Sequence, residues 1–184
     1  MERQEAYELL KKNVFNENLI KHCVSVESIM IKIAEYFKED TKKWGLSGLL
    51  HDIDYEKTKD NPTTHGLISI DILKPFNLDD EILESIKGHN EMLGLERKTL
   101  MAKALFCVDQ LSGLIVASTL VLPSKKIQDL TLDSIMKKFK EKSFAKGAKR
   151  ENISLCESDL NIKLEDFILI ALKAMQSVAS EIGL

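Results

Sequence analysis

Cysteine, proline, glycine and histidine are all scarce in this 184-residue chain, which contains three Cys, three Pro, eight Gly and four His. The cysteines lie far apart and form no CxxC pair, which excludes a disulfide framework and favours free thiols in a reducing cytoplasm. Few glycines and prolines mean few breaks in regular structure. No segment alternates apolar and polar residues as a strand does, so the sequence predicts an all-α protein.

Two further absences narrow the function. Basic residues do not outnumber acidic ones, with 26 Lys and Arg against 29 Asp and Glu, which argues against extended nucleic-acid binding but leaves small phosphorylated substrates open. The longest apolar run, 111–122, is too short to span a bilayer, and the first residues, MERQEAYELL, are unlike a signal peptide. We therefore expect a cytoplasmic protein without a membrane partner.

Helical periodicity is present over most of the chain, with apolar residues recurring every three or four positions. The composition, 44% hydrophobic and 30% charged, favours one soluble domain over 1–184, with its main core at 16–122 and a C-terminal helical extension at 123–184. We expect a polar loop at 54–61. Asn16, Thr41 and either Asp79 or Asp80 can cap the helices that begin near 16, 41 and 79. Helices are predicted at 2–12, 16–39, 41–52, 62 onwards, 79–89, 99–120, 132–142, 150–157 and 164–182.

The four histidines have ordinary structural explanations when each is taken alone. His22 shares a helix face with Val26 and could be a satisfied core histidine. His65, near the first turn of the helix that begins at 62, could lie on the surface, and His89 could cap a helix C-terminus. His51 directly precedes an aspartate and follows an apolar run, which places it at the inner end of a helix. Together, these explanations require every histidine to fall into one ordered pattern by coincidence.

Asp109 is the clearest anomaly, because it lies on the apolar stripe of the predicted helix 99–120. A buried ionised carboxylate is costly unless it is paired or binds a metal. A salt bridge to Lys103 or a protonated acid would be the structural explanation. Gly113, one turn away, instead leaves space where a substrate or metal would lie, which favours a functional site.

Read in order, these residues give His, His-Asp, His, His, Asp, and this pattern resembles the HD-domain superfamily of metal-dependent phosphohydrolases. The resemblance covers 22–109, about half the chain, and implies an all-α helical bundle with a central metal site. Imidazole and carboxylate suit Fe, Mn, Zn, Co or Ni, and the two additional histidines imply two divalent ions rather than one. The implied ligands are His22, His51, Asp52 and Asp109 for one ion, and His65 and His89 for the other, with Asp52 bridging.

The chain departs from the family pattern at three points, and two of them separate it from the cyclic-dinucleotide-cleaving branch. The common variant His-Asp-Ile-Gly has Asp54 in place of its glycine here. That branch also has two adjacent histidines where this chain has His89 and Asn90, and no Gly-Tyr-Pro signature is present. The chain looks more like a small standalone family member.

Catalysis would depend on water activated by divalent ions and on cations that hold phosphate. Asp52 would bridge the two ions and orient the metal-bound hydroxide, and Asp54, Glu56 or Glu91 could relay a proton. The basic stretch 137–150 could be a solvated face or could fold over the site. The predicted catalytic residues are Asp52, Asp54 and Lys57, and the predicted substrate-binding residues are Lys57, Lys87, Lys138, Lys142 and Arg150.

The ligand set leaves three functions open. We expect hydrolysis of a small phosphomonoester or nucleotide. A di-iron oxygenase is the first alternative, because the same ligands suit iron and some HD-domain proteins oxidise organic substrates with O₂. The second is a non-catalytic metal-binding or sensing module, which would lack an open coordination position. The apolar last helix could also serve a homodimer.

Overall fold

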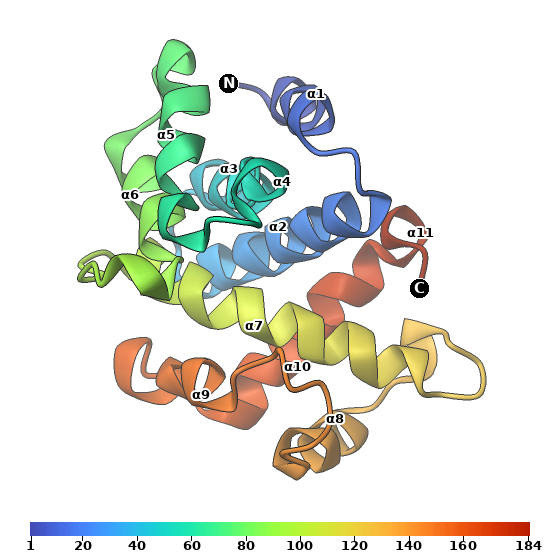
Figure 1. The fold of residues 1–184 in the computed structure, drawn as a ribbon. Helices are drawn as coiled ribbons and strands as arrows, with labels where there is room; N and C mark the ends of the chain where they lie inside the picture. Colours follow the sequence, from blue (N-terminus) through green and yellow to red (C-terminus); the bar gives the residue numbers. More distant parts are fainter.

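The computed structural model describes residues 1–184 as helices joined by turns and loops, with no β-strand, which confirms the all-α prediction (Figure 1). Four short 3-10 turns are η1 (Pro62–Thr64), η2 (Lys74–Phe76), η3 (Glu91–Leu93) and η4 (Ile127–Asp129). The α-helices are α1 (Arg3–Asn13), α2 (Glu17–Phe37), α3 (Thr41–Leu50), α4 (Tyr55–Thr58), α5 (Leu67–Leu73), α6 (Asp80–Gly88), α7 (Leu100–Leu120), α8 (Leu132–Lys140), α9 (Arg150–Asp159), α10 (Leu164–Ser177) and α11 (Ala179–Ile182).

Helices α2 and α7 form the centre of the bundle (Figure 1). Helix α2 packs against α3, α7 and α10, while α7 also packs against α6 and α9. One cluster of 42 buried apolar residues joins these helices, and Trp44 and Phe167 are the largest fully buried side chains. Burial of this apolar surface is the main force that fixes the relative positions of the helices.

The 21-residue helix α7 is long and apolar enough to cross a membrane by length and composition alone, although the run 111–122 by itself is not. Of its most apolar window, 61% is buried inside the fold. A helix that is apolar on nearly all sides is the expected centre of a helical protein, and α7 occupies that place.

Side chains fix several helix ends as the sequence predicts. Asn16 accepts a hydrogen bond from the amide of Asn18 at the start of α2, and Asp79 accepts one from Glu81 at the start of α6. The cap of α3 differs from the prediction. Asp40, not Thr41, accepts from the amides of residues 42 and 43, because an ionised carboxylate is the stronger acceptor.

The segment 54–67 also differs from the prediction. The predicted loop contains the short helix α4, and the predicted helix from residue 62 is only the 3-10 turn η1. Gly66 has φ +83°, a left-handed conformation that interrupts a helix, so α5 begins one residue later. His65 therefore lies in an extended link between two helical segments and not in the first turn of a helix.

Candidate metal centre

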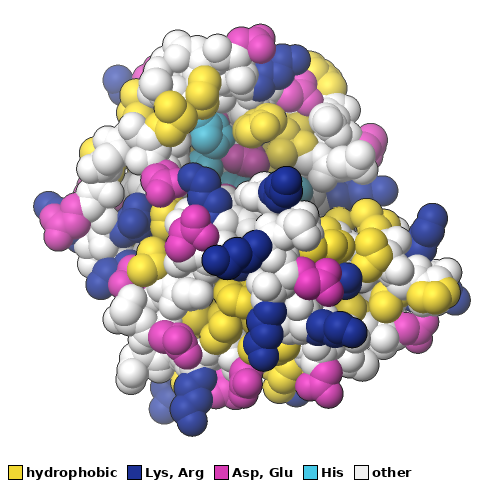
Figure 2. Space-filling view, turned by 60° about the horizontal axis from the view of Figure 1, so that its bottom comes forward, with side chains coloured by type: hydrophobic (Ala, Val, Ile, Leu, Met, Phe, Trp, Pro, Cys, Tyr) yellow, Lys and Arg dark blue, Asp and Glu magenta, His cyan; other side chains and the backbone are white.

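Six predicted ligands converge between the central helices, although they are far apart in the sequence. Two come from the middle of long helices, and the other four follow helix or turn ends. The space-filling view shows histidine and acidic side chains at the bottom of a hollow (Figure 2). The predicted ligands are His22 on α2, His51 and Asp52 after α3, His65 after η1, His89 after α6, and Asp109 on α7.

The first half of the cluster is formed by His22, His51, Asp109 and one oxygen of Asp52. His22 Nε2 lies 3.2 Å from His51 Nε2 and 3.1 Å from Asp109 Oδ1. Asp52 Oδ2 lies 3.7 Å from His22 Nε2 and 3.6 Å from His51 Nε2. Ligands that share one ion at about 2.0–2.2 Å lie roughly 3–3.5 Å apart, so these donors have the spacing of a coordination shell.

The second half uses the other oxygen of Asp52 together with His65 and His89. Asp52 Oδ1 lies 3.2 Å from His65 Nε2 and 3.4 Å from His89 Nε2. The two imidazole nitrogens are 2.9 Å apart. Asp52 thus presents one oxygen to each half, which is the arrangement of a bridging carboxylate.

A close approach of two helices brings the first half together. A Cβ atom on Gly48 would lie 2.9 Å from the backbone N and Cα of Glu27, so only glycine lets α3 approach α2 this closely. His51 lies three residues after Gly48 and reaches His22 on the facing helix. Gly48 therefore allows the close helix packing that brings His51 next to His22.

Two of the histidines are oriented by carbonyl groups at helix ends. His51 Nδ1 lies 2.8 Å from the carbonyl oxygen of Gly48, and His89 Nδ1 lies 2.5 Å from that of Ile86. Because a carbonyl only accepts, both Nδ1 atoms are protonated and both Nε2 atoms face the cluster. His89 is thus a helix cap and a potential ligand at the same time.

A serine on α7 orients His22. Ser112 donates its hydroxyl hydrogen to the carbonyl of Asp109 at 2.8 Å. The same oxygen then accepts from His22 Nδ1 at 3.1 Å, because the single hydroxyl hydrogen is already used. His22 Nε2 is therefore left for the cluster, as in the other histidines.

Asp54 orients His65 from behind. The Asp54 side chain is completely buried, and its Oδ1 accepts from His65 Nδ1 at 2.7 Å. Its Oδ2 accepts from the amides of Gly66 and Ser69 at 2.8 and 2.9 Å. The predicted proton relay by Asp54 does not fit this position, because both oxygens face protein donors and neither faces the cavities at the cluster. The residue instead fixes the tautomer of a potential ligand, as acidic partners of metal-bound histidines do.

The donor set fits a divalent metal. With each Nδ1 next to an oxygen, all four Nε2 atoms face the cluster, and pairs of them approach to 3.2 and 2.9 Å. Lone pairs at that distance repel each other unless a proton or a metal ion lies between them. Imidazole and carboxylate donors are what zinc, manganese and iron ions prefer.

The pKa values of these groups reflect strong mutual attraction in the metal-free protein. Burial opposes protonation of His51 and His65, but nearby carboxylates outweigh it and raise the pKa of His51 to about 9 and that of His65 to about 10. Burial would raise the pKa of Asp52 and Asp109, but the histidines hold both well below the ordinary value. Asp109 is thus neither protonated nor paired with Lys103, the two structural explanations considered for it.

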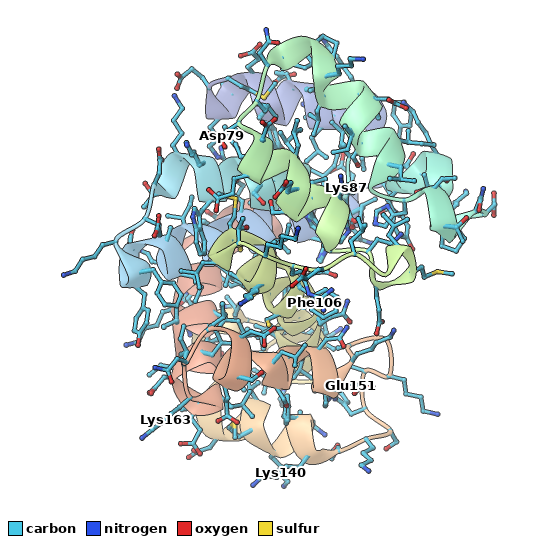
Figure 3. All side chains as sticks on the ribbon, turned by 90° about the vertical axis from the view of Figure 1, so that its left-hand side faces the viewer. Asp79, Lys87, Phe106, Lys140, Glu151 and Lys163 are labelled. Carbon is cyan, nitrogen blue, oxygen red and sulfur yellow. The ribbon has the colours of Figure 1, made fainter.

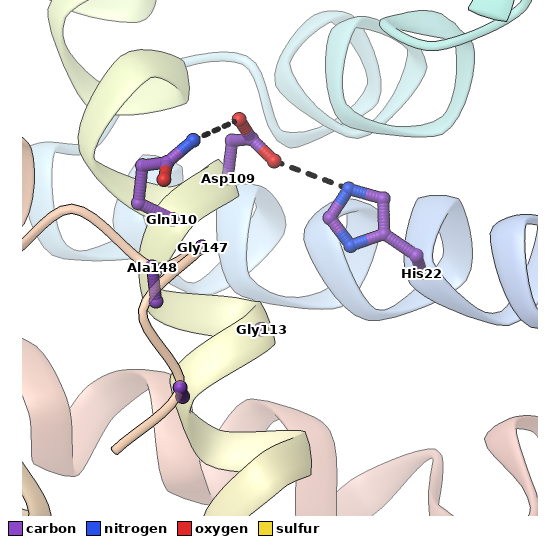
Figure 4. Close-up of a pocket in the computed structure, with 7 residues that line it drawn as sticks. His22, Asp109, Gln110, Gly113, Gly147 and Ala148 are labelled. Carbon is purple, nitrogen blue, oxygen red and sulfur yellow. Dashed lines mark hydrogen bonds and ion pairs between the residues drawn. The ribbon is translucent and has the colours of Figure 1, made fainter. Parts of the chain in front are cut away.

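Open space adjoins the cluster on several sides. A cavity of about 290 Å³ is lined by His22, Asp109, Gln110 and Gly113, among others (Figure 4). No atom lies within 4 Å of the position that a Cβ atom on Gly113 would occupy, as the sequence predicted. A second cavity, of about 320 Å³, exposes Asp52, His65 and His89 from the other side. Both halves of the cluster are therefore open to adjoining cavities.

The predicted substrate-binding cations do not gather at this cluster. Lys57 Nζ donates to Asn13, Lys138 pairs with Glu141, and Lys87 is half-buried on α6. Lys142 is exposed and lines none of the cavities at the ligands. In Figure 3, Lys140 at the end of α8 lies far from Lys87, and no residue of α8 lines a cavity at the predicted ligands. Neither catalysis by Lys57 nor phosphate binding by these lysines gains support from their positions.

Arg150 has a structural role in place of the predicted phosphate clamp. Its guanidinium donates to the carbonyls of Phe139, Ala145, Ala148, Lys138 and Phe144. These bonds use the planar fork of donors that a phosphate would need. Arg150 thus holds the loop between α8 and α9 in place.

The two glutamates considered for proton relay also have protein partners. Glu56 accepts from the amides of Phe15 and Asn16 at 2.8 and 2.7 Å, which caps the start of α2. Glu91 pairs with Lys149 at the rim of the second cavity. Proton relay by either residue stays a prediction without a direct contact to the ligand atoms.

Sequence reasoning missed three residues that surround the ligands. Asn90 donates to the carbonyls of Pro62 and His65, which ties the link that carries His65 to the end of α6. Gln110 donates to Asp109 Oδ2 at 2.9 Å (Figure 4). Lys149 lines the second cavity. In the sequence, Asn90 and Gln110 are indicated only by their positions next to predicted ligands.

Comparison with known proteins agrees with this geometry. Residues 19–114 match the HD domain, a span that holds all six predicted ligands and more than half of the chain. This chain belongs to the HD-domain family. Membership points to a metal-dependent hydrolase and to divalent metal binding by the cluster. No solved structure matches the chain.

Curated relatives resemble the chain at low identity. Ribonuclease Y of Lawsonia intracellularis is 29% identical over 148 residues, which is 79% of this chain and 28% of the relative. An uncharacterized protein of Methanocaldococcus jannaschii is 24% identical over 172 residues, which covers 88% of this chain and 98% of the relative. The chain thus spans little more than a quarter of ribonuclease Y.

Proposed function

We propose that this protein hydrolyses a small phosphomonoester or nucleotide at a centre that holds two divalent metal ions. The observation that carries the proposal is Asp52, whose two oxygens face different pairs of histidines. His22, His51 and Asp109 would complete one ion's site, and His65 and His89 the other. When bound, such ions supply an activated water and offset the charge that develops on phosphate.

The protein's own residues would prepare the centre before substrate arrives. The protonated Nδ1 atoms aim the histidines, and the buried Asp54 holds His65. Fixed donors in a partly buried site need no rearrangement when the reaction begins. Two divalent ions exceed the charge of the Asp52 and Asp109 carboxylates, so the loaded centre would attract a phosphate dianion.

Cleavage of an RNA phosphodiester is the second candidate. Similarity to ribonuclease Y over most of this chain favours it. The net charge of −3 and the single Lys or Arg in the second cavity favour a small substrate instead. A long polyanion needs a basic surface along its path, which the sequence composition does not indicate.

The test begins with elemental analysis of protein purified without added metal. Phosphate release is then measured under anaerobic conditions from nucleotides and sugar phosphates with Mn²⁺, Fe²⁺ or Co²⁺, beside cleavage of a short RNA. The proposal predicts two ions per chain and phosphate release that is absent in Asp52→Ala. Cleavage of the RNA alone would favour the second candidate. Oxygen consumption by the iron form, without hydrolysis, would favour an oxygenase.

A further inference from the structure

The rim of the second cavity carries one cation. Twelve residues line this cavity, and they include Asp52, His65 and His89 from the second half of the cluster. Lys149 is the only Lys or Arg among the twelve. It is the last residue of the loop between α8 and α9, and the other lysines of this loop, Lys142 and Lys146, line none of the cavities at the ligands. The basic stretch 137–150 therefore contributes one side chain to the site.

Hydrogen bonds tie the backbone of Lys149 to a predicted ligand. The amide of Lys149 donates to Gln110 Oε1 at 3.1 Å, and Gln110 Nε2 donates to Asp109 Oδ2 at 2.9 Å. The other oxygen of Asp109 faces His22. Two hydrogen bonds thus separate the Lys149 backbone from the ligand cluster, which fixes where its side chain begins.

The side chain of Lys149 has a weak partner. Its ammonium pairs with Glu91 on η3, two residues after His89. Both side chains are about half exposed, at 52% and 53%. An exposed ion pair between two flexible side chains contributes little, so a dianion at the adjacent centre could displace Glu91. The pair holds the ammonium at the rim of the cavity until an anion arrives.

We propose that Lys149 is the phosphate-binding arm of this site and exchanges the Glu91 carboxylate for a phosphate oxygen of the substrate. The inference rests on the proposed function, because it assumes a phosphorylated ligand at the centre. The exchange replaces one charge-assisted hydrogen bond with another, so Lys149 stays paired throughout. Glu91 competes with the phosphate for Lys149, so an anion binds only if its affinity is high enough to displace the Glu91 carboxylate.

Lys21 lines a cavity that contains only His22 among the predicted ligands, so Lys59 is the stronger alternative cation. Lys59 lines a neighbouring cavity that also contains His22 and Asp52. Its side chain has no hydrogen bond or ion pair that holds it toward the cluster, whereas Lys149 is tied at its backbone and its ammonium. Lys146, exposed on the same loop as Lys149 and outside these cavities, offers a matched control.

The experiment measures inorganic phosphate binding to the manganese-loaded protein by calorimetry, with metal content determined for each variant. Lys149→Ala should weaken phosphate binding about tenfold or more, and Lys149→Arg should recover most of it. Glu91→Gln should strengthen binding by about twofold to fivefold, because the competitor is removed. Lys59→Ala and Lys146→Ala should bind phosphate as the wild type does.

Several results would overturn the proposal. They are unchanged phosphate binding in Lys149→Ala, a larger loss in Lys59→Ala, loss of manganese from Lys149→Ala, or no phosphate binding by the wild type. Failure of the proposed function is distinct, since it would show as no hydrolysis of any ester. If no ester is hydrolysed but phosphate binding still depends on Lys149, the role of Lys149 in phosphate binding would remain supported.

Discussion

The two halves of the ligand cluster are constructed differently. The first half takes His22, His51 and Asp109 from the long helices α2 and α7 and the end of α3, which pack together in the core. Its supporting groups are neutral, a serine hydroxyl and a backbone carbonyl. Its geometry therefore depends mainly on the packing of whole helices.

The second half depends on shorter segments and on one buried charge. His65 lies in an extended link between η1 and α5, where helix packing alone does not fix it. Asp54, completely buried, holds that link through His65 and the amides of Gly66 and Ser69. The first predicted ion site is therefore formed by packed helices, whereas the second depends on the buried Asp54 carboxylate.

The largest effect is expected where the two halves meet. Asp52→Ala removes one oxygen from each half and should abolish binding of both ions together with hydrolysis. Elemental analysis and phosphate release measure the two losses, and circular dichroism checks that the helices persist. A variant that kept its full metal content would contradict the assignment of Asp52 as the bridge.

Removal of a histidine from one half should separate the halves. His89→Ala should reduce the metal content from two ions per chain to one, because the ligands of the first half remain in place. His22→Ala should remove the ion from the first half instead. Titration of the metal-free variants with Mn²⁺ counts the sites. Loss of both ions from His89→Ala would mean that the halves do not bind independently.

Asp54→Asn tests the dependence of the second half on a buried charge. Asparagine keeps the shape of aspartate but weakens the acceptor for His65 Nδ1, so the affinity of the second ion should fall about 10- to 100-fold. The first ion should bind as before. Asp60→Asn, at an exposed carboxylate six residues along, is the control and should change neither affinity.

Ser112→Ala is expected to have a smaller effect, on the first half only. The hydroxyl is a neutral acceptor for His22, and bonds to neutral groups are about half as strong as those to charged ones. We expect the affinity of the first ion to fall less than tenfold, near the lower end for groups that support a ligand. A larger loss of metal affinity in Ser112→Ala than in Asp54→Asn would contradict the proposed difference between the two halves.

The pH dependence should distinguish the metal-free from the loaded protein. His51 and His65 have pKa values raised to about 9 and 10 by the carboxylates, so their stabilising protonation is complete below about 6.5 and is lost as the pH rises through 9 and 10. Metal binding displaces those protons and should tighten over the same range. The gap between melting temperatures with and without Mn²⁺ should therefore widen from pH 6.5 to 9.

Much of the cluster could be predicted from the sequence, because few residue types bind metals and this chain contains only four histidines. The order of His and Asp residues sufficed to select six side chains that converge in the structure, and their role as ligands stays a prediction. The helices followed from apolar periodicity, and capping residues such as Asn16 marked their starts.

The supporting residues could not be predicted in the same way. Asp54 was assigned to catalysis because sequence shows an acid beside the ligands but not the direction of its side chain. Arg150 was assigned to phosphate binding because the sequence does not reveal that five carbonyls surround its guanidinium. The partners of Asp54 and Arg150 lie only 2 to 15 residues away, but they depend on the conformation of the connecting turns and loops, which the sequence does not specify.

Anomalous diffraction from crystals of the manganese-loaded protein would test the central claim most directly. The account predicts two peaks about 3.5–4 Å apart, one beside each oxygen of Asp52, with His22, His51 and Asp109 around one and His65 and His89 around the other. A single peak, or peaks away from this carboxylate, would contradict it.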